Sequence, residues 1–116
     1  MELHEYPGSI AKTQTELHHL ETEITELVED TKLIELEIDK QISFNTEYKN
    51  ETQRKTARKD LLDKHSDYWE FIECLKRLKS KREELSIELV RLQGEFSVKK
   101  LLKREFVAKL EMVGAN

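Results

Sequence analysis

The feature that most constrains this chain is a long stretch without helix breakers. From Ser9 to Gln93 the sequence contains neither proline nor glycine, although the whole chain has one proline and three glycines. A β-protein needs turn residues roughly every 8–12 positions, and this stretch does not supply them. The sequence therefore predicts an all-α fold built from long helices.

Apolar residues in the first half of the chain recur with a seven-residue period. The heptad positions a and d, counted together, are Ile10, Thr13, Leu17, Leu20, Ile24, Leu27, Thr31, Ile34, Ile38, Gln41, Asn45 and Tyr48. A repeat of this kind is typical of a left-handed coiled coil. It predicts a first helix over about 9–49, with Ser9 as its N-cap and residues 1–8 as a flexible N-terminal lead-in.

The apolar pattern fails in the middle of the chain. Residues 50–60 contain one alanine and no larger aliphatic residue, so they form either the polar turn of a hairpin or an exposed bridge within one long helix. Asn50 followed by Gln53 also fits the cap of a new helix.

A second apolar pattern predicts a second helix over about 61–113. Its inner face recurs at spacings of three and four residues at Leu75, Leu78, Arg82, Leu85, Leu89, Leu92 and Phe96. Gly94 costs only about 1 kcal/mol relative to alanine inside a helix. It is therefore compatible with a continuous helix or with a bent C-terminal helical segment.

The charge distribution predicts how the two halves pair. Residues 1–49 hold 12 acidic and 4 basic residues, net −8, whereas residues 50–116 hold 12 acidic and 16 basic residues, net +4. Helices of opposite sign avoid like-charge pairing when they pack together. We therefore expect residues 9–116 to form one domain, a long antiparallel helical hairpin or coiled coil. With a turn near residue 55, Ile10 would lie opposite roughly residue 100.

Composition and the expected overhang together indicate a protein that binds other helices. Apolar residues make up 37% of the chain and charged residues 38%, which suits thin helical structures in which each helix buries one stripe. An apolar C-terminal overhang needs a partner, either a second copy in a homodimer or higher oligomer, or another helical protein. The predicted partner-binding residues are Tyr68, Trp69, Ile72, Leu101, Leu102 and Phe106.

The residues that could bind a metal or take part in catalysis do not form a recognisable catalytic or metal-binding pattern. The spacing from Glu16 to His19 matches one half of a di-iron helix motif, but the second motif that such a site needs is missing. The single cysteine, Cys74, excludes an intramolecular disulfide framework. No phosphate loop or zinc pattern is present. We expect no catalysis, no metal and no cofactor, and a structural or adaptor role.

A basic cluster in the middle of the chain supports an alternative function. Arg54, Lys55, Arg58 and Lys59 could contact phosphates at the tip of a nucleic-acid-binding accessory hairpin. The net charge of −4 and the isoelectric point of about 5.6 argue against such a role.

Membrane insertion has no support in the sequence. No apolar run approaches the roughly 20 residues of a membrane span, and the first residues do not resemble a secretory signal. The basic amphipathic stretch 96–113 could lie on a membrane surface, but a packing helix is the preferred interpretation. A cytoplasmic location is expected.

Overall fold

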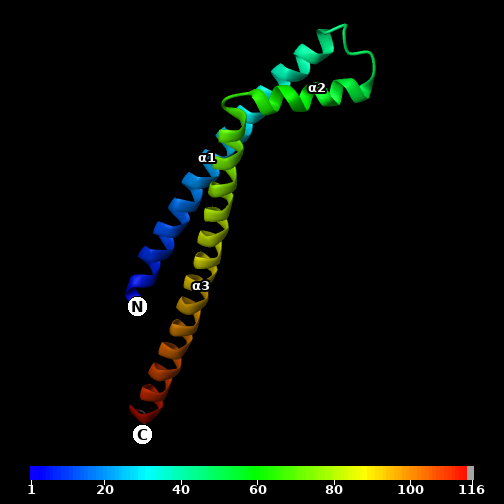
Figure 1. Ribbon diagram of the computed structural model, residues 1–116. Coiled ribbons are helices and arrows are strands. Elements are labelled where there is room, and N and C mark those ends of the chain that lie inside the picture. The colour runs from blue at the N-terminus through cyan, green and yellow to red at the C-terminus, as the bar shows by residue number, and fades with distance from the viewer. Residues whose placement is uncertain (115–116) are drawn as a thin grey trace. The chain divides into compact units, whose positions relative to one another are not determined.

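The computed structural model describes residues 1–114, and every regular element in that range is a helix (Figure 1). A short 3-10 helix, η1 (Leu3–Glu5), leads into α1 (Tyr6–Phe44), which is followed by α2 (Glu51–Lys64) and α3 (Tyr68–Gly114). This element order confirms the predicted all-α fold and helical hairpin. α3 continues through Gly94 without interruption.

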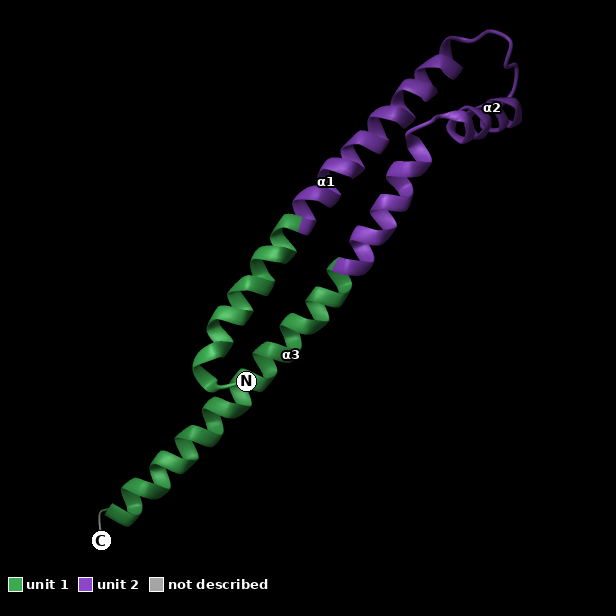
Figure 2. Cartoon of the chain, turned by 60° about the vertical axis from the view of Figure 1, so that its left-hand side comes forward, with its two compact units in different colours: residues 1–19, 82–116 green, residues 20–81 purple. Residues whose placement is uncertain are grey.

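Two compact units make up the chain, coloured separately in Figure 2. Unit 1 contains residues 1–19 and 82–116, and unit 2 contains residues 20–81. In unit 1, α1 and α3 lie side by side and run in opposite directions, since Tyr6 contacts Glu95 whereas the earlier residue Met1 contacts the later residue Lys99.

The pairing register differs from the expected one. With Tyr6 opposite Glu95, Ile10 lies opposite roughly residue 91 and not residue 100. The difference in register has its physical reason in unit 2. There α2 packs against the last turns of α1. Tyr68 at the start of α3 therefore contacts Glu35 and not the end of α1. More of α3 is therefore left over at its C-terminal end than a simple turn would leave.

The heptad pattern of α1 describes its buried face with one exception. Leu20, Ile24 and Ile38 are buried, as are the polar seam residues Thr13 and Thr31. Gln41, a predicted seam position, is exposed, and Ile42 is buried in its place. The seam advances by four residues there instead of three, because burying the isoleucine avoids the cost of burying an amide.

The expected flexible lead-in, residues 1–8, is mostly exposed but contains one packed side chain. Tyr6 is only 2% exposed, the lowest value among the described residues. Pro7 lies in the first turn of α1, where proline is tolerated because the backbone N–H it lacks has no intrahelical acceptor. Ser9 is not the N-cap, since it lies within α1 and its carbonyl accepts a hydrogen bond from the Thr13 hydroxyl.

The polar middle segment forms a helix of its own. Asn50 is the N-cap of α2, and its side chain accepts a hydrogen bond of 2.8 Å from the Gln53 N–H. The Gln53 side chain accepts in turn from the Lys49 N–H, which resembles a capping box. α2 ends at Lys64, and the backbone of its C-cap residue, His65, is extended. The segment expected as one helix over 61–113 is thus divided between α2 and α3.

The core of unit 2 forms where its three helical segments meet. Ile38 and Ile42 of α1, Leu62 of α2 and Tyr68 of α3 form one buried cluster. Further partly buried apolar residues pack around it: Ile34, Tyr48, Ala57, Leu61 and Ile72. α2 therefore buries one narrow apolar stripe, which explains how so polar a segment is held in place.

Candidate protein-interaction surface

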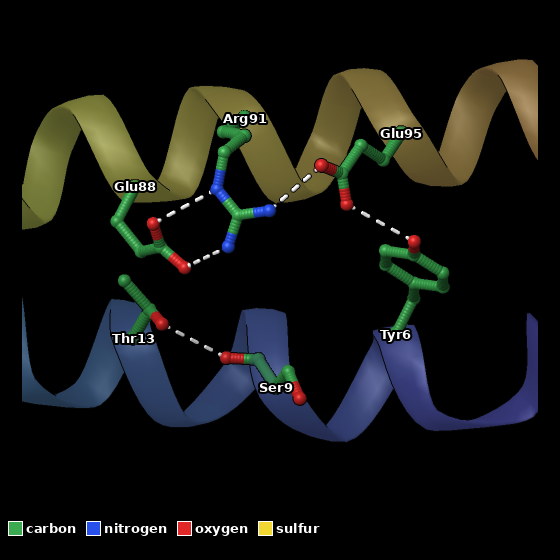
Figure 3. A network of polar contacts seen from close by, with 6 residues as sticks. All are labelled: Tyr6, Ser9, Thr13, Glu88, Arg91 and Glu95. Carbon is green, nitrogen blue, oxygen red and sulfur yellow. Dashed lines mark hydrogen bonds and ion pairs between the residues drawn. The ribbon is translucent and has the colours of Figure 1, made fainter. Parts of the chain in front are cut away.

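A polar network joins α1 to α3 in unit 1 (Figure 3). The Tyr6 hydroxyl donates a hydrogen bond of 3.0 Å to the Glu95 carboxylate. The Arg91 guanidinium donates to the same carboxylate at 2.7 Å and also forms an ion pair with Glu88. Because Tyr6 comes from α1 and the other three residues from α3, the network fixes the register of the two segments.

The charges of this network stay paired and are not poised for proton transfer. Hydrogen bonds from Arg91 lower the pKa of Glu88 and, together with the Tyr6 hydroxyl, that of Glu95. The two carboxylates raise the pKa of Arg91 in return. A general acid or base needs a pKa near the working pH, whereas these shifts move every group further from neutrality. The network joins α1 to α3 through groups that stay charged near neutral pH.

Aromatic and cationic side chains complete the end of the paired region. The rings of Tyr6 and Phe96 are stacked, with centroids 5.7 Å apart. The Lys99 ammonium lies 5.2 Å from the Tyr6 ring centroid and donates a hydrogen bond to the Met1 carbonyl. The Lys100 ammonium lies 4.3 Å from the Phe96 ring centroid. These contacts join the first residues of the chain to α3.

Beyond Phe96, every described residue of α3 is exposed. The predicted contact residues Leu101, Leu102 and Phe106 lie here and are 57%, 58% and 62% exposed. Further apolar side chains share the segment and are also exposed: Val98, Val107, Leu110, Met112 and Val113. We call residues 97–114 the C-terminal segment. Monomeric proteins seldom expose so many apolar side chains together unless the surface binds something.

The predicted aromatic contact residues in unit 2 have different surroundings. Tyr68 is buried in the core of unit 2, and its hydroxyl donates a hydrogen bond of 2.8 Å to Glu35. Burial and this hydrogen bond raise the pKa of Tyr68. Ile72 packs against the same core. Trp69, at 47% exposure, is the accessible member and meets the Tyr68 ring edge-on. Tyr68 is therefore packed within unit 2, and Ile72 is partly buried against the same core.

The basic cluster expected to contact phosphates lies on α2 and is partly neutralised. Arg58 donates a hydrogen bond of 2.8 Å to Asp39, which raises the pKa of Arg58. Lys55 lies 4.0 Å from Glu51 one turn earlier. An open hollow of about 440 Å³ is lined by Lys55, Arg58, Lys59, Leu62, Asp63, Tyr68 and Trp69. It brings cations and an indole ring together but includes a carboxylate, Asp63.

Two features of this surface were not predicted from the sequence. Tyr6 stands four residues before Ile10, so the heptad series could have been extended back to it. Ile87 and Val90 are exposed on α3, 65% and 69% respectively. They lie outside the inner face of α3 and stand among charged residues, so the heptad pattern gave them no role.

Comparisons with protein-family models, with curated proteins and with solved structures find no significant match. Within residues 1–114, no three His, Cys, Asp or Glu side chains are grouped in a way that could hold a metal ion. None of the helices in this range combines the length and the apolar character of a membrane-spanning segment.

Proposed function

We propose that this protein is a non-catalytic coiled-coil adaptor or structural protein, and that its C-terminal segment mediates protein–protein interaction or self-assembly. The observation that carries the proposal is the exposure of this whole segment, residues 97–114, together with its apolar side chains. A helix gains most of its stability in a protein from packing its apolar face. A partner that covered these side chains would stabilise the segment and bury apolar area.

The chemistry of the remaining surface supports the same function. The polar network around Arg91 holds paired charges, and the open hollows of unit 2 are lined by a mixture of charged, uncharged polar and apolar side chains. A small-molecule site is usually concave and mostly apolar with a few convergent polar groups. The described residues present helical faces instead, which are suited to binding other helices.

Nucleic-acid binding through α2 is the weaker alternative. It depends on four cations, of which Arg58 is bound to Asp39 and Lys55 lies near Glu51. Each phosphate contact must compete with these carboxylates, and the chain as a whole is acidic. Protein binding by the C-terminal segment does not require a partner to displace these carboxylates.

Site-specific photo-crosslinking tests the proposed function. A photoreactive phenylalanine analogue replaces Phe106 in one variant and Glu111 in a control variant. Glu111 belongs to the same exposed segment but lies five residues on, about 140° around the helix. Irradiation of the protein in its native cells should give a discrete adduct from position 106 and little from position 111. Equal, diffuse labelling from both positions would show that this segment has no specific partner.

A further inference from the structure

Buried residues are distributed unevenly between the two units. Nine apolar and two polar residues are buried within the described range 1–114, and unit 1 holds only three of them, Tyr6, Thr13 and Leu92. Unit 2 holds the others: Leu20, Ile24, Thr31, Ile38, Ile42, Leu62, Tyr68 and Leu75. A region with few buried apolar contacts opens at a lower free energy than the core of the same protein. Unit 1 should therefore open more readily than unit 2.

The part of the chain that pairs with α3 in unit 1 is residues 1–19, which we call the N-terminal strap. Ile10 and Leu17 of its predicted seam are only partly buried. Thr13 is buried, but its hydroxyl donates to the Ser9 carbonyl of the same helix. That hydrogen bond stays intact whether or not the strap lies on α3. The middle of the strap is therefore held to α3 by modest apolar burial.

A cluster of contacts centred on Tyr6 ties the strap to α3. The Tyr6 hydroxyl donates to Glu95, as Figure 3 shows, and its ring stacks on Phe96. Lys99 lies over the same ring and donates to the Met1 carbonyl. We call these five residues the Tyr6 latch. Because the latch is built around one buried side chain, its loss should free the strap and leave the core of unit 2 in place.

The strap and the part of α3 beneath it differ in their preference for helix. Proline, glycine, threonine and histidine occupy six of the fourteen positions 6–19, whereas leucine, arginine, glutamate and glutamine occupy ten of the fifteen positions 82–96. The second group favours helix more strongly than the first. A short segment of weak helix formers does not stay helical without packing. Separation should therefore unfold the strap while α3 remains a helix.

The strap covers one part of an apolar stripe on α3. Leu92 is 3% exposed and Phe96 is partly buried, whereas Phe106 and Leu110, fourteen residues further along in each case, are exposed. Residues fourteen apart lie within about 40° of each other around a helix. The covered residues and the exposed ones therefore belong to the same side of α3, and the strap determines where exposure of this side begins.

We propose that the N-terminal strap is a conformational device that opens from α3 as one unit while unit 2 stays folded. The Tyr6 latch holds it closed, and opening uncovers Leu92 and Phe96. In the closed state the exposed apolar side chains on this side of α3 are those of the C-terminal segment. In the open state the exposed side extends back beneath the strap. The inference goes beyond the proposed function and does not depend on it, because opening is a property of the purified chain.

Thiol labelling under native conditions tests whether the strap opens separately. In a Cys74→Ser background, Leu92→Cys places a thiol beneath the strap, and Ile38→Cys places one in the core of unit 2 as the matched control; both native side chains are less than 5% exposed. A maleimide dye should label position 92 at least roughly tenfold faster, because it needs only local opening. Urea should accelerate labelling at position 92 less steeply, since local opening exposes less surface. Equal rates with equal urea dependence would overturn the proposal.

Substitution of the latch tests what holds the strap closed. Tyr6→Ala, combined with each thiol variant, should raise the labelling rate at position 92 by roughly tenfold or more and leave the rate at position 38 unchanged. Gln14→Ala is the control within the strap, since Gln14 is exposed, and it should change neither rate. Equal acceleration at both positions would show that opening is global unfolding. No acceleration at position 92 would show that Tyr6 is not the latch. Either result would contradict the inference.

Hydrogen exchange on the unmodified chain guards against loosening of the strap by the Leu92→Cys substitution itself. Backbone amides of residues 10–19 should share one opening free energy, and it should be lower than that of residues 38–42. A single shared value below that of unit 2 is the signature of a strap that opens as one unit. Protection that equals that of residues 38–42, or that declines steadily from residue 19 to residue 10, would overturn the proposal, because the first result means no separate opening and the second means gradual fraying.

Discussion

Replacing Tyr6 with alanine tests the packing that closes unit 1. The Tyr6 ring is 2% exposed, stacks on Phe96 and lies beneath the Lys99 ammonium. A buried aromatic side chain removes about 150–250 Å² from water, which at about 25 cal/mol per Å² corresponds to roughly 4–6 kcal/mol as an upper bound. Removing large core aromatics costs about 3–5 kcal/mol in compact proteins. Because Tyr6 lies at the end of a helix pair that can fray, we expect the low end, about 3 kcal/mol.

The loss should be measured by urea denaturation followed by circular dichroism, with hydrogen exchange to locate it. Protection should fall mainly in residues 1–19 and 82–96. Phe44→Ala is the control, since Phe44 is 85% exposed and its loss should cost less than about 0.5 kcal/mol. The stability lost in Tyr6→Phe should lie between the losses in Tyr6→Ala and Phe44→Ala, because Tyr6→Phe keeps the ring and loses the hydrogen bond to Glu95. A Tyr6→Ala protein as stable as the Phe44→Ala protein would refute the packing of the N-terminal segment.

Three further predictions follow from the helix seam and the two polar contacts. Urea denaturation should show that Ile42→Ala lowers the free energy of unfolding by about 2–3 kcal/mol and Gln41→Ala by less than about 0.5 kcal/mol. Equal effects would contradict the shift of the seam from Gln41 to Ile42. The pKa of Glu95 is held below its ordinary value of 4.5 by hydrogen bonds, first from Arg91. The stability it adds is therefore present above pH 4.5 and is lost as the pH falls, so melting temperatures of wild type and Glu95→Gln should converge in acid. The pKa of Tyr68 is raised above 10.0, mainly by burial, so its stabilising effect is complete below pH 10.0 and is lost at higher pH. Absorbance of tyrosinate should show a late-titrating phenol that disappears in Tyr68→Phe, and its absence from wild type would contradict the burial of this ring.

Local rules explain why much of the fold was predictable from the sequence. A stretch free of proline and glycine, with Leu and Ile at three- and four-residue spacing, leaves helix as the only regular structure that buries its apolar residues. The Asn50 and Gln53 cap is likewise a local signal, because its hydrogen bonds join residues three apart. Opposite net charges on the two halves predicted the antiparallel direction, which the contact between Tyr6 and Glu95 confirms in unit 1.

The candidate surface was predictable only in part. Leu101, Leu102 and Phe106 were expected at an overhang, and the structure leaves all three exposed. Tyr68 and Ile72 belong to the same sequence pattern but are packed in the core of unit 2. Apolar spacing identifies which faces can be buried. It does not identify which of them the chain buries itself, because that depends on where distant segments come to lie.

The sequence by itself determined helix content, the α1 seam before residue 41 and the direction of pairing, since each follows from neighbours within one or two turns or from net charge. The tertiary structure alone decided three matters. It buried Tyr6 beside residues about 90 positions away, moved the seam from Gln41 to Ile42, and folded the polar α2 against the end of α1. These outcomes depend on how side chains of different helices interlock, because close packing selects among registers whose local preferences are nearly equal. That choice also determined how much of α3 was left exposed.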